Sequence, residues 1–120
     1  MKRDLYADLC AWKGSARRKP LILRGARQVG KTHLLKEFGN KEYSGVAYFN
    51  FEEDPRLKGF FTGRLNPTAL IEALGLYRNE PIKAGEDLII FDEIQASNEA
   101  LNALKYFQEQ ANDFHIAAAG

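Results

Sequence analysis

One segment of the chain has the residue types and spacing of a phosphate-binding loop. Residues 25–32 read Gly-Ala-Arg-Gln-Val-Gly-Lys-Thr and match G-x-x-x-x-G-K-[ST] at every fixed position. In such a loop, backbone N–H groups and the N-terminus of the next helix bind phosphate oxygens, and glycine lets the backbone approach them. Lys31 is expected to contact the β- and γ-phosphates, and Thr32 to ligate Mg²⁺. The alternative is a chance match in a glycine-containing turn.

A pair of carboxylates is the second chemical signal. Asp92 and Glu93 directly follow the apolar segment 88–91, which reads Leu-Ile-Ile-Phe. Ligands of parallel sheets bind at the carboxyl ends of strands, so both side chains are expected at the edge that holds the loop. Asp92 is then expected to hold the metal, as a Walker B aspartate does, and Glu93 to orient or deprotonate an attacking water. Alone, the pair could equally cap the following turn.

The nucleotide is expected to be ATP. A GTPase would have Asp-x-x-Gly where residues 92–95 read Asp-Glu-Ile-Gln, and the Asn-Lys-x-Asp guanine motif fails at Tyr43 in the segment 40–43. The sequence therefore favours Mg²⁺ and ATP as cofactor and ligand.

The segments that position these residues alternate between the two-residue hydrophobic period of a strand and the 3.6-residue period of a helix. Apolar strands are predicted at 21–23, 46–51 and 88–91, with a fourth beginning near Phe114, and amphipathic helices are predicted between them. The helix signals are Asp4 as an N-cap, Gly39-Asn40 as a helix end, Asp54-Pro55 and Asn66-Pro67 as helix starts, and Ser97 as an N-cap. Alternating strands and helices indicate a parallel sheet. The strands 21–23 and 88–91 are apolar throughout, without alternating polar residues, and are therefore predicted to be central.

Composition limits the class of protein. The 120 residues carry 17 Lys+Arg and 16 Asp+Glu, a net charge of +1, so a broadly basic nucleic-acid-binding domain is not indicated. No apolar run approaches the roughly 20 residues of a membrane span. The single cysteine, Cys10, cannot form an intrachain disulfide, which favours the cytoplasm. His115 is expected at the rim of a strand.

The segments 24–32, 50–52 and 91–95 together resemble the predicted AAA+-type P-loop ATPases of bacteria and archaea, which usually carry a C-terminal domain of unknown function. The segments 103–107 and 116–120 fit the same family pattern, so the resemblance spans nearly the whole chain. It implies a three-layer α/β P-loop fold of the additional-strand ATPase type, with the phosphate-loop strand beside the fourth strand, then the third and second. It also implies truncation after the fourth core strand: a polar sensor would follow Gly120, and an arginine finger would lie further on. His33 stands where the family often has a small polar residue.

The resemblance also singles out Asn50. In many AAA+ ATPases an asparagine at the end of the second strand hydrogen-bonds the catalytic glutamate, and Asn50 falls where it could do this to Glu93. An asparagine that ends a strand in a turn is an equally good interpretation. Arg27 could contact phosphates or a neighbouring subunit, or point to solvent. The residues expected to contact nucleotide are Gly25, Ala26, Arg27, Gln28, Val29, Gly30, Lys31, Thr32 and His33.

These observations predict a Mg·ATP-binding ATPase. Glu93, Lys31 and Asn50 are the expected catalytic residues, and Thr32 and Asp92 the expected metal ligands. Residues 1–17 are expected to be a helix and linker that pack on the core, and 18–120 the N-terminal part of the ATPase domain. Any protein partner or second subunit is expected to bind regions beyond Gly120. The alternative function is a nucleotide-gated switch or interaction module with negligible turnover; a small-molecule kinase fits the carboxylate pair less well.

Overall fold

The computed structural model describes residues 2–16, 18–24, 29–63 and 66–120 of the chain. Within them, four strands form one sheet in the order β1-β4-β3-β2, and every strand pair is parallel. The strands are β1 (Leu21–Leu23), β2 (Gly45–Asn50), β3 (Asp87–Asp92) and β4 (His115–Ala119). The α/β class, the parallel sheet and the strand order implied by the family resemblance are confirmed.

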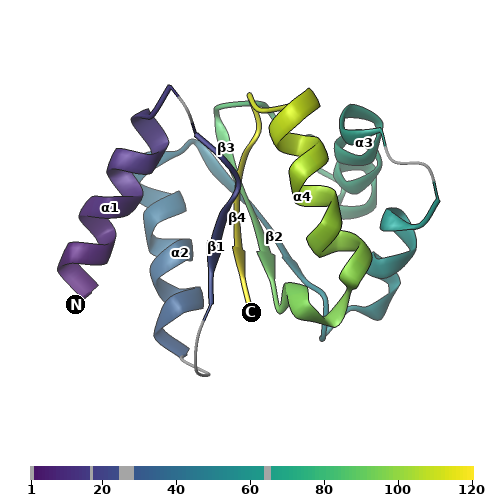
Figure 1. Ribbon diagram of the computed structural model, residues 1–120, viewed down its shortest axis with the longest axis horizontal. Helices are drawn as coiled ribbons and strands as arrows, with labels where there is room; N and C mark the ends of the chain where they lie inside the picture. The colour runs from purple at the N-terminus through teal and green to yellow at the C-terminus, as the bar shows by residue number, and fades with distance from the viewer. Residues whose placement is uncertain (1, 17, 25–28, 64–65) are drawn as a thin grey trace.

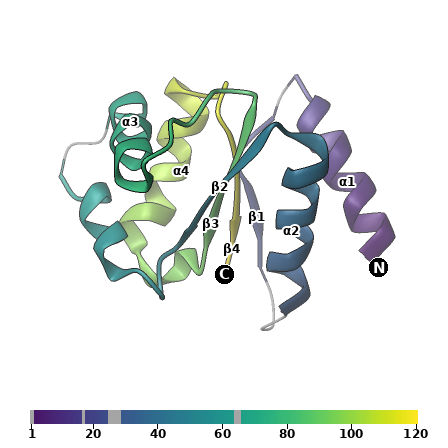
Figure 2. The same cartoon turned by 180° about the vertical axis from the view of Figure 1, so that it is seen from behind.

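Helices cover both faces of the sheet. On one side lie α1 (Lys2–Gly14) and α2 (Val29–Glu42), and on the other lie α3 (Pro67–Arg78) and α4 (Asn98–Gln110) (Figures 1 and 2). Two short 3-10 helices, η1 (Pro55–Phe61) and η2 (Ile94–Ala96), follow β2 and β3. The helix α2 begins at the edge of the sheet toward which the strands point. This edge is called the carboxyl edge below, and the opposite one the amino edge.

The central strand β3 divides the core into two clusters. Leu88 and Ile90 pack with the residues of α1 and α2, whereas Ile89 and Phe91 pack with those of η1, α3 and α4, and all four are fully buried. This alternation follows from the two-residue period of a strand. Asp92 continues the Leu88–Ile90 series and therefore lies on the α2 side of the sheet.

The prediction that segment 21–23 is a central strand is wrong for the described sheet. In that sheet β1 pairs only with β4, through Leu21↔Ala117 to Leu23↔Ala119, so it is an edge strand. Its three residues are accordingly only partly buried. The segment 88–91 is confirmed as central, since β3 pairs with both β2 and β4.

Three helix starts are confirmed by their capping hydrogen bonds. Asp54 accepts from the Arg56 amide before η1, Asn66 from the Ala69 amide before α3, and Ser97 from the Ala100 amide before α4. Such side chains satisfy amide groups that lack a partner in the first helical turn.

Two predicted helix boundaries are wrong. Asp4 does not cap the first helix, because α1 already begins at Lys2. Gly39 and Asn40 do not end the second helix, which continues to Glu42. Gly39 is instead a packing residue: a Cβ there would come within 2.5 Å of the Val46 side chain and 3.1 Å of Leu88. Glycine thus lets α2 approach β2 and β3 closely.

His115 is not the rim residue that the sequence suggested. It begins β4 and is 8% exposed, with the Trp12 and Tyr43 rings packed against it. No helix among the described residues combines the length and apolar character that a membrane crossing requires.

Candidate nucleotide and metal site

The carboxyl edge brings together the two predicted metal ligands. Thr32 lies in the first turn of α2 and Asp92 is the last residue of β3, 60 positions further along the chain. The Thr32 hydroxyl donates a hydrogen bond of 2.9 Å to Asp92 Oδ2. The Asp92 side chain is on the α2 side because of its position in the strand alternation, and it is 6% exposed. A helix start and a strand end thereby converge on one carboxylate.

The predicted phosphate loop is only partly described. Gly25, Ala26, Arg27 and Gln28 lie outside the described residues, and Val29 begins α2. Gly30, Lys31 and His33 also lie in the first turns of α2, with Gly30 and His33 exposed and Lys31 half-buried.

Gly30, in the first turn of α2, has open space around it. A Cβ added to Gly30 would meet no atom within 4 Å. Contacts among the described residues therefore do not explain why glycine stands there. Open space of this kind leaves room for a ligand at the helix N-terminus, and Gly59 has it as well.

Tyr48 is a site residue that the sequence interpretation missed, because strand aromatics are usually core residues. Its hydroxyl donates a 2.5 Å hydrogen bond to Asp92 Oδ2, the oxygen that also accepts from Thr32. Burial, followed by this hydrogen bond, raises the pKa of the Tyr48 phenol. The phenol therefore remains a donor at neutral pH. Lys36, one turn beyond Thr32 on α2, places its ammonium 3.9 Å from the centre of the Tyr48 ring.

Asn50 supports Tyr48 and the turn after β2. Its Oδ1 accepts hydrogen bonds of 2.9 Å from the amides of Glu52 and Glu53, and its Nδ2 donates a 3.2 Å hydrogen bond to the Tyr48 hydroxyl. The structure thus places Asn50 at the expected strand end, in contact with the partner of Asp92. The described hydrogen bonds of Asn50 do not include one to Glu93, so that contact stays a prediction.

Glu93 has an unusual backbone conformation. Its φ of 53° and ψ of 44° lie in the left-handed region, which is sparsely populated by residues with a side chain. In this conformation its amide donates a 2.9 Å hydrogen bond to Asp92 Oδ1, and its own Oε1 accepts one of 2.8 Å from Gln95 Nε2. Gln95 belongs to the segment 91–95 that carries the family resemblance, but the sequence interpretation gave it no role.

The Asp92 carboxylate is consequently held by three donors. Thr32 and Tyr48 donate to Oδ2, and the Glu93 amide donates to Oδ1. The described residues include no group of three or more His, Cys, Asp or Glu side chains that could hold a metal by themselves. The oxygen set of Thr32 and Asp92 suits Mg²⁺, which commonly binds one or two protein oxygens and takes its other ligands from water and substrate phosphates.

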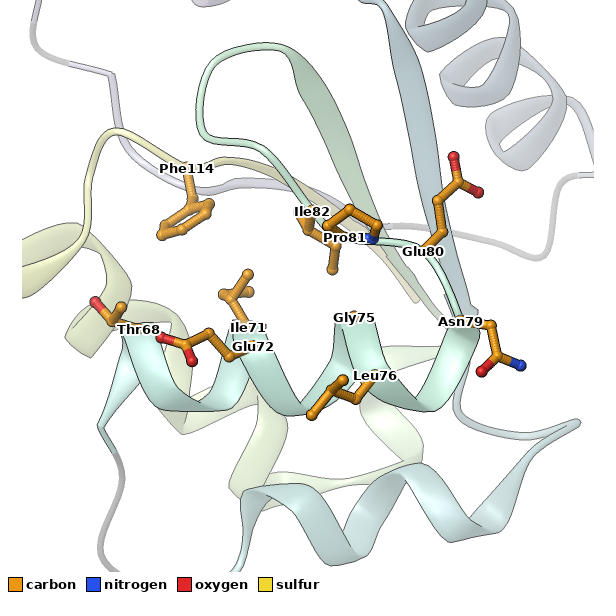
Figure 3. A pocket seen from close by; sticks show the side chains of 10 residues that line it. All are labelled: Thr68, Ile71, Glu72, Gly75, Leu76, Asn79, Glu80, Pro81, Ile82 and Phe114. Atoms are coloured by element: carbon orange, nitrogen blue, oxygen red, sulfur yellow. The ribbon is translucent and has the colours of Figure 1, made fainter.

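A cavity of about 670 Å³ lies at the other end of the sheet (Figure 3). It is lined by residues along α3, including Ile71 and Leu76, by Pro81 and Ile82 ahead of β3, and by Phe114 ahead of β4. The cavity is at the amino edge, and the predicted nucleotide residues take no part in its lining.

Comparison with known families agrees with this arrangement. The model of an AAA domain family matches residues 17–120. Neither the curated proteins nor the solved structures contain a significant match to the chain. Since the family match covers most of the chain and includes both the helix start that carries Thr32 and the strand end that carries Asp92, the chain belongs to this AAA domain family.

Proposed function

We propose that the chain binds Mg·ATP at the carboxyl edge and that the full-length protein hydrolyses it. The hydrogen bond between Thr32 and Asp92 is the observation that carries this proposal. In a P-loop NTPase, a helix-start hydroxyl and a strand-end carboxylate must lie side by side to hold one Mg²⁺ between them and the phosphates. Membership of an AAA domain family supports a nucleotide as the ligand.

The proposed binding roles follow from position. Residues 25–30 and the N-terminus of α2 would hold phosphate oxygens with backbone amides, and the Lys31 ammonium would contact the β- and γ-phosphates. Arg27 and His33 are proposed only to line the nucleotide. Thr32 and Asp92 would hold Mg²⁺, which neutralises charge on the phosphate oxygens when bound. Tyr48 would keep the Asp92 carboxylate oriented toward Thr32.

The proposed hydrolytic step uses Glu93 as its base. A water attacks the γ-phosphorus in line, forming a new P–O bond as the bond to the β–γ bridging oxygen breaks, and ADP leaves. The Glu93 carboxylate orients this water and accepts its proton. Asn50 remains a proposed positioning residue. An Asn50→Ala variant with unaltered turnover, both alone and when stimulated by a binding partner, would remove it from the mechanism.

Residues 18–120 are proposed as part of the ATPase domain, with residues 1–17 as a helix and linker packed on it. Leu9 of α1 supports this division because it is fully buried in the cluster that contains Leu35 and Phe38 of α2. A cytoplasmic location is proposed from the single cysteine.

Phosphate release by the full-length protein, measured with and without Mg²⁺, tests the proposed activity. We expect Mg²⁺-dependent turnover that a Glu93→Gln variant loses while it still binds ATP. If ATP binds but neither protein releases phosphate, the chain is instead a nucleotide-gated switch. If ATP does not bind, the proposed function is wrong.

A further inference from the structure

The carboxylate of Glu93 has a side-chain partner in η2. Gln95 lies two residues after Glu93, and its Nε2 donates the 2.8 Å hydrogen bond to Glu93 Oε1. The left-handed backbone at Glu93 makes the turn into η2. Glu93 Oε1 is therefore taken by an amide donor.

The other end of the Gln95 amide lies against β4. A Cβ built on Gly120, directly after β4, would come within 2.1 Å of Gln95 Oε1 and 3.2 Å of its Cδ. The Gly120 amide in turn donates to the Leu23 carbonyl of β1 at 3.2 Å. The exposed Gln95 side chain thus lies between the end of β3 and Gly120, and a side chain at position 120 would displace its amide.

We propose that Gln95 is a positioning residue for hydrolysis, which orients the Glu93 carboxylate toward the attacking water, and that glycine at position 120 leaves the Gln95 amide in place for this contact. This inference rests on the proposed function. A carboxylate with one oxygen fixed by a donor presents the lone pairs of its other oxygen in a defined direction, as a general base must. Gln95 makes this contact with Glu93, whereas the described partners of Asn50 are Tyr48 and the amides of Glu52 and Glu53.

Two substitutions at Gln95 test the proposal in the full-length protein. Gln95→Ala removes the donor, and Gln95→Glu keeps the size of the side chain but replaces the donor by a second carboxylate. We expect both to lower kcat by about 10- to 100-fold, the usual cost of losing a positioning partner, and to leave KM for ATP within about twofold. Unchanged kcat in both variants, or a rise in KM with unchanged kcat, would overturn the proposal.

Gly120→Ala tests the same contact from the other side. The new methyl group would displace the Gln95 amide, so we expect a fall in kcat of similar size to that of Gln95→Ala. In the Gln95→Ala background the methyl group no longer meets the side-chain amide and keeps only a 3.3 Å approach to the backbone nitrogen of residue 95, so Gly120→Ala should cause little further loss. Gly59→Ala is the matched control, because a Cβ there meets no atom within 4 Å. Additive losses from Gln95→Ala and Gly120→Ala would contradict a shared contact.

The double variant Glu93→Gln/Gln95→Ala separates this inference from the proposed function. If Gln95 acts through Glu93, the double variant has the same residual kcat as Glu93→Gln alone. A further loss would show that Gln95 acts elsewhere and would overturn the inference only. A wild-type protein without turnover would overturn both, whereas loss of turnover in Glu93→Gln with full turnover in Gln95→Ala would leave the proposed function standing.

Discussion

The two edges of the sheet bury polar side chains in different ways. At the carboxyl edge, Asp92 is 6% exposed and accepts from Thr32 and Tyr48, which come from α2 and β2. At the amino edge, His115 is 8% exposed and lies among aromatic rings, with its Nδ1 2.5 Å from the Tyr43 hydroxyl. Both groups have hydrogen-bond partners, as buried polar groups require.

The difference lies in what each arrangement leaves available. The carboxyl edge keeps oxygen ligands beside a helix start where Gly30 has open space around it. The amino edge closes over its imidazole with Trp12 and Tyr43, and burial followed by the positive charges of Arg18 and Lys13 lowers the pKa of His115 to about 4, against an opposing effect of Asp113. We propose the first edge as the ligand site, whereas at the second the buried imidazole makes stability depend on pH.

The largest expected effect is the loss of turnover in Glu93→Gln at the carboxyl edge. Removing a general base lowers kcat by about 10²- to 10⁴-fold, and ATP binding should persist because the phosphate-binding residues are unchanged. Single-turnover phosphate release and equilibrium ATP binding measure the two effects. Glu109→Gln, an exposed position on α4, is the control and should behave as wild type.

At the amino edge, the buried His115 leads us to expect a free energy of unfolding that depends on pH. The folded-state pKa of His115 is lowered from 6.5 to about 4, so the unfolded chain binds the proton more readily. The free energy of unfolding therefore has its full value above pH 6.5 and decreases as the pH falls toward 4, by up to about 1.4 kcal/mol per pH unit. Urea unfolding between pH 7 and 4 measures this loss.

Two variants assign that pH effect to His115. His115→Gln should flatten the pH dependence in this window, whereas His33→Gln, on the exposed surface of α2, should leave it unchanged. Equal slopes in wild type and His115→Gln would show that the buried imidazole is not responsible.

A smaller effect is expected at the predicted phosphate loop. Lys31→Ala removes a charge-assisted contact to phosphate and should weaken ATP binding by about 1.5–3 kcal/mol. Isothermal titration calorimetry with ATP and Mg²⁺ measures the change. Lys58→Ala, an exposed lysine in η1, is the matched control, and equal ATP affinity in Lys31→Ala and wild type would remove Lys31 from the site.

The sequence predicted the residues whose position follows from local rules. Thr32 belongs to a contiguous motif at a helix start, and Asp92 ends an apolar strand, so the rule that parallel strands bind ligands at their carboxyl ends brings the two together. The strand order required the family resemblance, because local pattern does not determine which parallel strands are neighbours.

The missed residues depend on tertiary register and backbone conformation. Tyr48 reaches Asp92 because β2 pairs with β3 through Tyr48↔Ile90 and Asn50↔Asp92, and no turn fixes the register of a parallel pair. Gln95 reaches Glu93 because Glu93 adopts a positive φ, which residue type does not indicate. Gly39 was mistaken for a helix end because its actual role is close packing of α2 on Val46.

The smallest effect compares two tyrosine–aspartate pairs with the same oxygen–oxygen distance. Tyr48 donates to Asp92 at the carboxyl edge, and Tyr77 donates to Asp54 beside η1, both at 2.5 Å. Only the first aspartate is a proposed metal ligand. Tyr48→Phe should lower the affinity for Mg²⁺ at fixed ATP by about tenfold, which is the lower end of the effect of losing a partner of a metal ligand. The reason is that Asp92 Oδ2 then keeps Thr32 alone as its side-chain donor.

Tyr77→Phe removes an equivalent hydrogen bond and should leave the Mg²⁺ dependence as in wild type. Titration of Mg²⁺ at fixed ATP measures both variants, with urea unfolding as a check on general stability. If both variants weaken Mg²⁺ binding equally, the effect comes from stability rather than from the orientation of Asp92. If neither does, Asp92 is held well enough by Thr32 and the Glu93 amide, and the Tyr48 hydroxyl serves only to satisfy a buried carboxylate.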